Sequence, residues 1–257
     1  EAKFVKKILK QFFIQSEILV WKGQKPHKNI QSESRIKRYE LIFKNCDKNG
    51  IKNILLGHHK DDLLENFFIR LLRGSGLKGL VSLDIKNEIS KKHLMRPLLN
   101  QKKEDLIFLS NYIFNFYVVD PTNENTKFQR IRIRKLLNEL KNDGLDKNKF
   151  IKTINNLKYS NEAINFYVKE NIEKNTYFFS EKKRLILNEL FFNQPYEIIF
   201  RSFSESIRLV SNNYYSSRGK KIDRIIKDMA NKNSFKSTLG GCIIEKVNQT
   251  VIITKEH

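Results

Sequence analysis

Helical and strand patterns alternate through residues 1–135, and this alternation constrains the fold more than any other feature of the sequence. Residues 31–49 and 61–73 have apolar side chains at helical spacing. Between them, residues 53–57 form a short run with Ile54, Leu55 and Leu56 in succession, which is typical of a strand covered on both faces. The order predicts an α/β domain built on a Rossmann-like, doubly wound parallel sheet.

The rest of the chain divides into a helical linker and a small α+β domain. Long helical patterns at 128–141 and 147–175, broken near Gly144, predict a linker over 136–176 after a first domain at 1–135. The small domain is expected at 177–257. Further helices are expected at 1–13, 103–114, 195–210 and 219–231, and β-rich runs at 17–21, 94–97, 116–119, 177–179, 242–246 and 250–254.

The chain is strongly basic, with 49 Lys and Arg against 28 Asp and Glu and a formal net charge of +21. This charge favours a polyanionic partner such as nucleic acid, and a sequence-wide bias toward Lys, Ile and Asn is the weaker alternative explanation. Two cysteines, Cys46 and Cys242, exclude a disulfide scaffold and a four-cysteine metal site, and they fit a reducing cytosol. No apolar run has the length of a membrane span. We therefore expect a cytoplasmic protein without a membrane partner.

Polar side chains follow the predicted strand directly, where ligands bind in doubly wound sheets. His58 and His59 are adjacent in extended backbone and point to opposite sides, so they do not suit one shared metal ion, and one of them is expected to face a cleft. Asp62 and Glu65 lie one turn apart on the helix that follows. The alternative is purely structural, because acidic residues in a first turn complement the helix dipole.

A Gly74-Ser75-Gly76 turn follows this helix, beside Arg70 and Arg73. Such a turn can bring backbone N–H groups close to an anion, although Gly74 also suits an ordinary helix C-terminus. The turn alone is therefore weak evidence for a phosphate site.

The run from His58-His59 through Asp61, Asp62 and Glu65 to residues 70–80 resembles the signature of tRNA(Ile)-lysidine synthetases, members of the PP-loop ATP pyrophosphatase group. The resemblance covers nearly the whole chain. It differs at Leu63 and Asn66, where Gln and Thr are common. It continues at Asn29-Ile30-Gln31, Arg35 with Arg38-Tyr39, Arg96-Pro97-Leu98, Asp120-Pro121-Thr122-Asn123, the arginines at 130, 132 and 134, and Thr238 to Cys242, which is similar to the family's small C-terminal domain.

One family motif is absent: no Ser-Gly-Gly-x-Asp-Ser sequence, which cradles the ATP phosphates in this family, occurs among the 257 residues. We expect that a strand-loop-helix-strand unit normally precedes Glu1 and that the chain by itself is inactive. Two alternatives stay open, a catalytically inactive tRNA-binding paralogue and another PP-loop tRNA-modifying enzyme such as a thiolase.

The resemblance implies ATP-dependent adenylation of the wobble cytidine of tRNA(Ile), followed by displacement of AMP by free L-lysine. His59 would contact the α-phosphate or the adenylated oxygen. Asp62 and Glu65 would bind the lysine ammonium or a Mg²⁺ ion that bridges the phosphates, and which acid does which stays open. The residues expected to bind the nucleotide are His58, Arg70, Arg73, Gly74, Ser75 and Gly76.

The same resemblance, with the charge pattern, supplies candidates for tRNA contact. Two basic stretches, 127–160 and 218–236, also suit RNA backbone, although a solvated helix face is the simpler reading of such runs. Arginines spaced by two spread around a helix, so only one or two of the three at 130–134 are expected to face the site. The sequence leaves a homodimer open. The candidates are Arg35, Arg38, Arg96, Asp120, Asn123, Arg130, Arg132 and Arg134.

Overall fold

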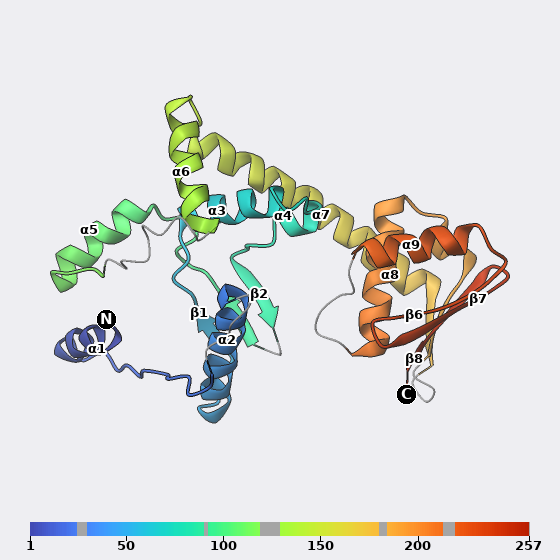
Figure 1. The fold of residues 1–257 in the computed structure, drawn as a ribbon, viewed down its shortest axis with the longest axis horizontal. Helices are drawn as coiled ribbons and strands as arrows, with labels where there is room; N and C mark the ends of the chain where they lie inside the picture. Colours follow the sequence, from blue (N-terminus) through green and yellow to red (C-terminus); the bar gives the residue numbers. More distant parts are fainter. Residues whose placement is uncertain (25–29, 90–91, 119–128, 180–183, 213–218, 257) are drawn as a thin grey trace. The chain divides into compact units, whose positions relative to one another are not determined.

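The computed structural model describes residues 1–24, 30–89, 92–118, 129–179, 184–212 and 219–256 (Figure 1). Asn29, Asp120, Asn123, Lys127 and Arg218 therefore lie outside the described residues. The chain forms two compact units, Glu1–Ile154 and Asn155–His257. Among the described helices, none has both the length and the apolar character needed to cross a membrane.

A small mixed sheet forms the centre of the first unit. Strand β1 (Asn53–Leu55) pairs in parallel with β3 (Lys92–Met95), and β2 (Lys86–Ile89) pairs antiparallel with β3, giving the order β1-β3-β2. Helix α2 (Ile30–Lys48) packs on this sheet through Cys46, which meets Ile54 and Leu94 in a small core. The α/β class and the parallel pair are confirmed, and the antiparallel strand β2 adds to the expected arrangement.

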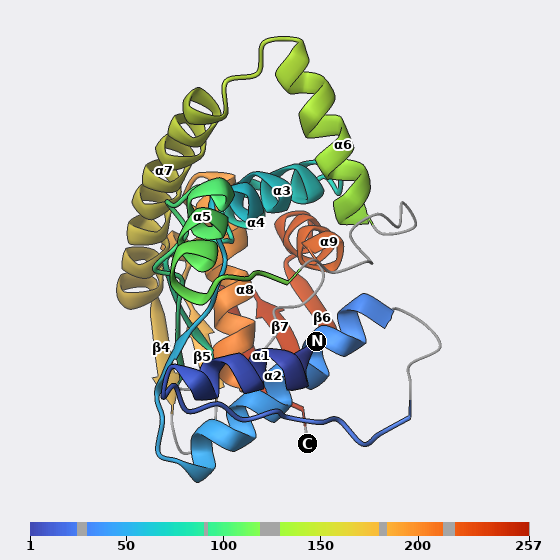
Figure 2. The ribbon, with the colours of Figure 1, turned by 90° about the vertical axis from the view of Figure 1, so that its left-hand side faces the viewer.

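Helix α3 (Lys60–Leu71) leaves the end of β1 after a short connection and is followed by α4 (Leu77–Leu80). Leu63, Leu64 and Phe67 of its apolar stripe are buried, whereas Leu71 at its end is exposed. Phe68 stacks on Phe150, which belongs to the first turns of α7 (Lys147–Asn175). Helix α6 (Gln129–Asn142) packs against α3 and reaches α7 through a turn at Gly144, as Figure 2 shows.

Two predicted strands of the first unit do not form. Residues 17–21 and 116–118 have no regular structure, and Val119 lies outside the described residues. Asn115 adopts a left-handed conformation that ends α5 (Lys103–Phe114), and the ring of Phe116 then packs edge-on against Phe4 of α1 (Ala2–Gln11). Their apolar side chains therefore indicate packing of irregular backbone and not pairing in a sheet.

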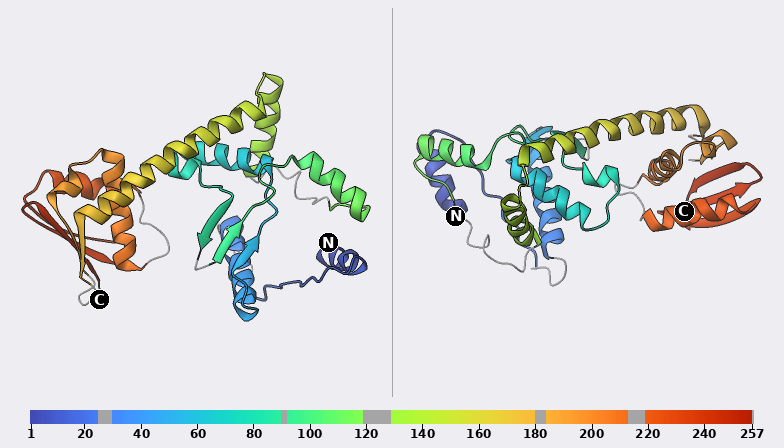
Figure 3. Two further views of the ribbon diagram at one scale, coloured as in Figure 1. Left: turned by 180° about the vertical axis from the view of Figure 1, so that it is seen from behind. Right: turned by 90° about the horizontal axis from the view of Figure 1, so that it is seen from above.

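The second unit is a five-stranded antiparallel sheet with helices packed on it (Figure 3). Its strand order is β4-β5-β8-β7-β6, and its core includes Phe191, Phe203 and Ile253, all fully buried. The strands expected at 177–179, 242–246 and 250–254 are confirmed, whereas β5 and β6 were not expected. Its elements after α7 are β4 (Thr176–Phe179), β5 (Arg184–Leu187), the 3₁₀ helix η2 (Glu189–Phe192), α8 (Tyr196–Ser211), α9 (Gly219–Ala230), β6 (Ser234–Leu239), β7 (Cys242–Val247) and β8 (Thr250–Lys255).

Candidate active site

The first two turns of α3 carry two buried carboxylates. Asp62 is 9% exposed and Glu65 only 2%. His59 is the residue at which the helix begins, and its backbone N–H donates to Asp62 Oδ2 across 3.0 Å. This bond satisfies one of the N–H groups that every helix start leaves unpaired, so Asp62 has a structural role in addition to any chemical one.

Glu65 forms an ion pair with Arg134 of α6, whose Nε donates to Glu65 Oε1 at 2.5 Å. Burial raises the pKa of Glu65 above its ordinary value, and Arg134 opposes that rise. Burial disfavours the charged form of a carboxyl group, and a neighbouring cation favours it. Glu65 is therefore an acid whose protonation responds to what binds beside it.

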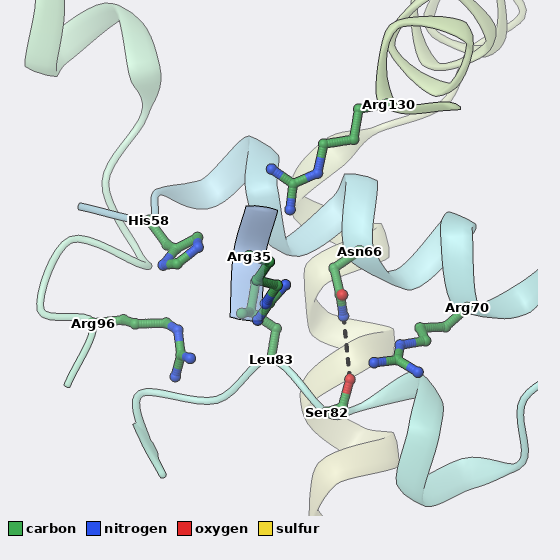
Figure 4. Close-up of a pocket in the computed structure, with 8 residues that line it drawn as sticks. All are labelled: Arg35, His58, Asn66, Arg70, Ser82, Leu83, Arg96 and Arg130. Carbon is green, nitrogen blue, oxygen red and sulfur yellow. Dashed lines mark hydrogen bonds between the residues drawn. The ribbon is translucent and has the colours of Figure 1, made fainter. Parts of the chain in front are cut away.

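Four arginines surround a small cavity next to these carboxylates (Figure 4). They come from separate segments: α2 for Arg35, α3 for Arg70, the end of β3 for Arg96 and α6 for Arg130. The cavity has a volume of about 90 Å³, and its remaining lining is His58, Asn66, Ser82 and Leu83. We call this the arginine pocket. None of these eight lining residues is acidic.

The arginines of the pocket repel one another. The pKa values of Arg70 and Arg96 are lowered, first by burial and then by neighbouring cations that include Arg35. His58 is affected in the same way: burial lowers its pKa most, Arg96, Arg130 and Arg35 lower it further, and Asp62 opposes them. The pocket is thus poised to take an anion.

Several buried polar atoms around the site have no hydrogen-bond partner among the described residues. They are His58 Nδ1, His59 Nδ1, Glu65 Oε2 and Arg96 Nε. Buried polar atoms are nearly always paired, so a group of unpaired ones marks a place where a ligand or water completes the bonding.

The predicted nucleotide and tRNA residues separate into those at the site and those elsewhere. Arg73 donates to Gln129 Oε1 at 2.7 Å and does not line the pocket. The N–H groups of Gly74 and Ser75 bond to the carbonyls of Leu71 and Arg70, so both serve the end of α3. The exposed Arg38 and Arg132 also do not line the arginine pocket.

Three residues that line the pocket were not predicted as site residues from the sequence: Asn66, Ser82 and Leu83. Asn66 Nδ2 donates to Ser82 Oγ at 3.4 Å. Asn66 directly follows Glu65 on the helix, and this position was the one sequence feature that could have predicted it as a site residue. Ser82 and Leu83 lie in an irregular segment, where no periodicity points to a site.

A metal site built from protein groups alone is not found: the described residues contain no group of three or more His, Cys, Asp or Glu side chains placed to hold an ion. Mg²⁺ is commonly held by one or two carboxylates together with substrate phosphates. Asp62 suits only this arrangement, in which substrate phosphates supply the remaining ligands.

A family comparison agrees with this architecture, because residues 1–140 match the model of the PP-loop domain. The chain therefore belongs to the PP-loop family. It is 31% identical over its whole length to the tRNA(Ile)-lysidine synthase of Wolbachia sp. subsp. Brugia malayi (strain TRS), and 30% identical to that of Wolbachia pipientis wMel.

In both cases the chain spans 60% of the relative's length. A further tRNA(Ile)-lysidine synthase, from Orientia tsutsugamushi (strain Boryong), is 37% identical over 140 residues, which are 54% of this chain and 32% of that protein.

Proposed function

We propose that this protein acts in the ATP-dependent joining of L-lysine to C2 of the wobble cytidine of tRNA(Ile), in the cytoplasm. The observation that carries the proposal is the buried pair Asp62 and Glu65, set beside an arginine pocket in a PP-loop domain. The relatives' names support the substrate, and the geometry supports a site that handles both a cation and an anion.

In the proposed reaction the C2 oxygen of cytidine attacks the α-phosphorus of ATP, and pyrophosphate leaves. The ε-amine of lysine then attacks C2, a C–N bond forms, and the C2–O bond to AMP breaks. Only the neutral amine is a nucleophile, so the lysine ammonium must first lose a proton.

Glu65 is the best placed residue for the lysine ammonium. Its Oε2 is buried and unpaired within the described structure, and its raised pKa suits a group that accepts a proton. Asp62 would hold Mg²⁺ together with the nucleotide phosphates, and Mg²⁺ would neutralise their charge. The side chain of His59, whose Nε2 lies 3.5 Å from Asp62 Oδ2, would contact the transferred phosphate.

The assay is ATP-dependent incorporation of labelled lysine into a tRNA(Ile) transcript. We expect the 257-residue chain to be inactive and the same chain preceded by a Ser-Gly-Gly-x-Asp-Ser loop segment of its family to react. Robust incorporation by the chain alone would contradict the requirement for that loop.

In the active form, Glu65→Gln should lower turnover by about a hundredfold or more, the scale of general-base catalysis. Glu139→Gln, on the exposed face of α6, is the matched control and should keep the wild-type rate. Near-wild-type turnover by Glu65→Gln would return Glu65 to a structural role. Sulfur transfer to tRNA in place of lysine incorporation would identify a thiolase, and tRNA binding without any transfer would identify the inactive paralogue.

A further inference from the structure

We propose that the arginine pocket binds one phosphodiester group of the RNA strand, next to the nucleotide that reacts. This inference rests on the proposed function, because it assumes an RNA substrate. It goes beyond it by assigning Arg35, Arg70, Arg96 and Arg130 to a single phosphate, although the sequence divides them between nucleotide and tRNA binding.

The pocket gathers four cationic side chains and no acidic one, and this charge favours an anion. Arg35, Arg70 and Arg130 have no ion pair among the described residues. Arg96 donates to the carbonyl of Asp84 and to Oδ1 of Asn87, while Tyr39 and Asp84 partly oppose the lowering of its pKa. Arg96 is held in place by these two bonds at 2.7 and 2.6 Å, while its Nε remains unpaired. A rigid buried guanidinium with a spare donor is the usual partner of a phosphate oxygen.

The size of the pocket selects a single phosphoryl group. Pockets for whole small-molecule ligands measure about 300–1,000 Å³, and this one measures about 90 Å³. The pocket therefore does not enclose a triphosphate or a nucleobase.

The source of that phosphoryl group is better explained by RNA than by ATP. A triphosphate brings Mg²⁺ with it, and in the proposed function Asp62, which does not line the pocket, would hold that ion and the nucleotide phosphates outside it. The pocket is also formed by the residues next to the proposed reaction centre: Asn66 follows Glu65 on α3, and Arg130 lies one turn before Arg134 on α6. A phosphate held here would keep its nucleotide beside the carboxylates.

The test measures binding of a fluorescent RNA hairpin with the anticodon loop of tRNA(Ile) to the 257-residue chain. Arg130→Gln and Arg70→Gln should each weaken binding about tenfold or more, as expected for loss of a charged hydrogen bond. Each should reduce the log-log salt slope by about 0.7, the value of one single-strand phosphate contact. Lys103→Gln, the same loss of one positive charge at an exposed position of α5 outside both basic stretches, is the control and should have less than about a twofold effect.

A single methylphosphonate, placed in turn at each loop position of the hairpin, then locates the phosphate. One position should weaken binding to the wild-type chain and have no further effect on Arg130→Gln, because both changes remove the same contact. Equal losses for Arg130→Gln and Lys103→Gln, or no position with this coupling, would overturn the proposal in favour of diffuse attraction.

ATP with Mg²⁺ provides the second arm, measured on the loop-bearing form. It should bind wild type and Arg130→Gln equally, because its phosphates would lie outside the pocket. Weaker ATP binding by Arg130→Gln, with hairpin binding unchanged, would assign the pocket to the nucleotide and overturn the RNA source. A failure of the proposed function would give a different result. The hairpin would bind tightly and show the coupling between Arg130 and one phosphate, but the loop-bearing form would not transfer lysine. Thermal unfolding of Arg70→Gln should not fall, since the change removes a repulsive charge, and this separates lost binding from lost folding.

Discussion

Lys147, the first residue of α7, places Nζ 2.8 Å from Asp61 Oδ1 in the first turn of α3. A second bond joins the same two helices with the lysine on the other one: Lys60 Nζ of α3 donates to Asn148 Oδ1 of α7 across 2.8 Å. Two helix starts that are 86 residues apart are thus joined by crossed side-chain bonds.

We expect this ion pair to stabilise the first unit modestly. A double-mutant cycle with Asp61→Asn and Lys147→Gln should give a coupling free energy of unfolding of about 0.5 kcal/mol, the range of partly exposed pairs. Chemical denaturation measures it, and raised salt should reduce it. A coupling of zero at low salt would show that the two residues are independent in solution.

The exposed lysines near Lys147 test RNA contact more directly than Lys147 does. Replacing Lys141, Lys149 and Lys152 with Gln should weaken tRNA binding and flatten its salt dependence by about 0.7 to 0.9 per lost phosphate contact. Turnover at saturating tRNA should change little, because these side chains position RNA and do not enter the reaction. An unchanged affinity and slope would assign them to a solvated helix face and direct attention to Lys220, Lys221 and Arg224 of the second unit.

Glu65 should make stability depend on pH. Because the folded pKa of Glu65 is raised above its ordinary value of 4.5, the folded state holds this proton more tightly than the unfolded state. Its stabilising contribution is therefore complete below about pH 4.5 and is lost as pH rises through the folded value. Relative to wild type, Glu65→Gln should gain unfolding free energy as the pH rises above about 4.5, as measured by denaturant titration. The opposite slope would mean that Arg134 outweighs burial.

His58 should report on the arginine pocket. Since burial and three nearby arginines lower its pKa below 6.5, NMR of the imidazole should show it neutral at pH 6.5 in the free protein. Arg130→Gln removes one repelling cation, and saturating inorganic phosphate screens all of them, so each should raise this pKa. Lys135→Gln serves as the control and should leave it unchanged. An unchanged His58 pKa at saturating phosphate would place the anion elsewhere.

Long regular patterns were predictable from sequence, whereas short strands and the convergence of the site were not. Helix α7 was expected at 147–175 and is found there, because many turns of apolar periodicity leave little ambiguity. Strand β2, Lys86–Ile89, was not expected, since its side chains are mostly polar and its stability comes from pairing with β3. The run at 116–118 was read as a strand because apolar character alone does not reveal whether a partner strand exists.

The candidate site also has features that the sequence predicts and features that depend on tertiary packing. The one-turn spacing of Asp62 and Glu65, and of Arg130 and Arg134, follows from helix geometry and is visible in the sequence. That Arg35 and Arg96 meet Arg70 and Arg130 depends on how α2, β3, α3 and α6 pack, and no local pattern encodes it.

The order of strands in the second unit sets the time at which it can fold during synthesis. Strand β8 lies at the middle of the sheet and bonds to both β5 and β7. Until residues 250–255 have left the ribosome, β5 has no neighbour on one side and two apolar strand edges stay open to other chains. The pairs β4–β5 and β6–β7 can form as they emerge, but a nascent chain would join them into one sheet only in a late step, when β8 is available.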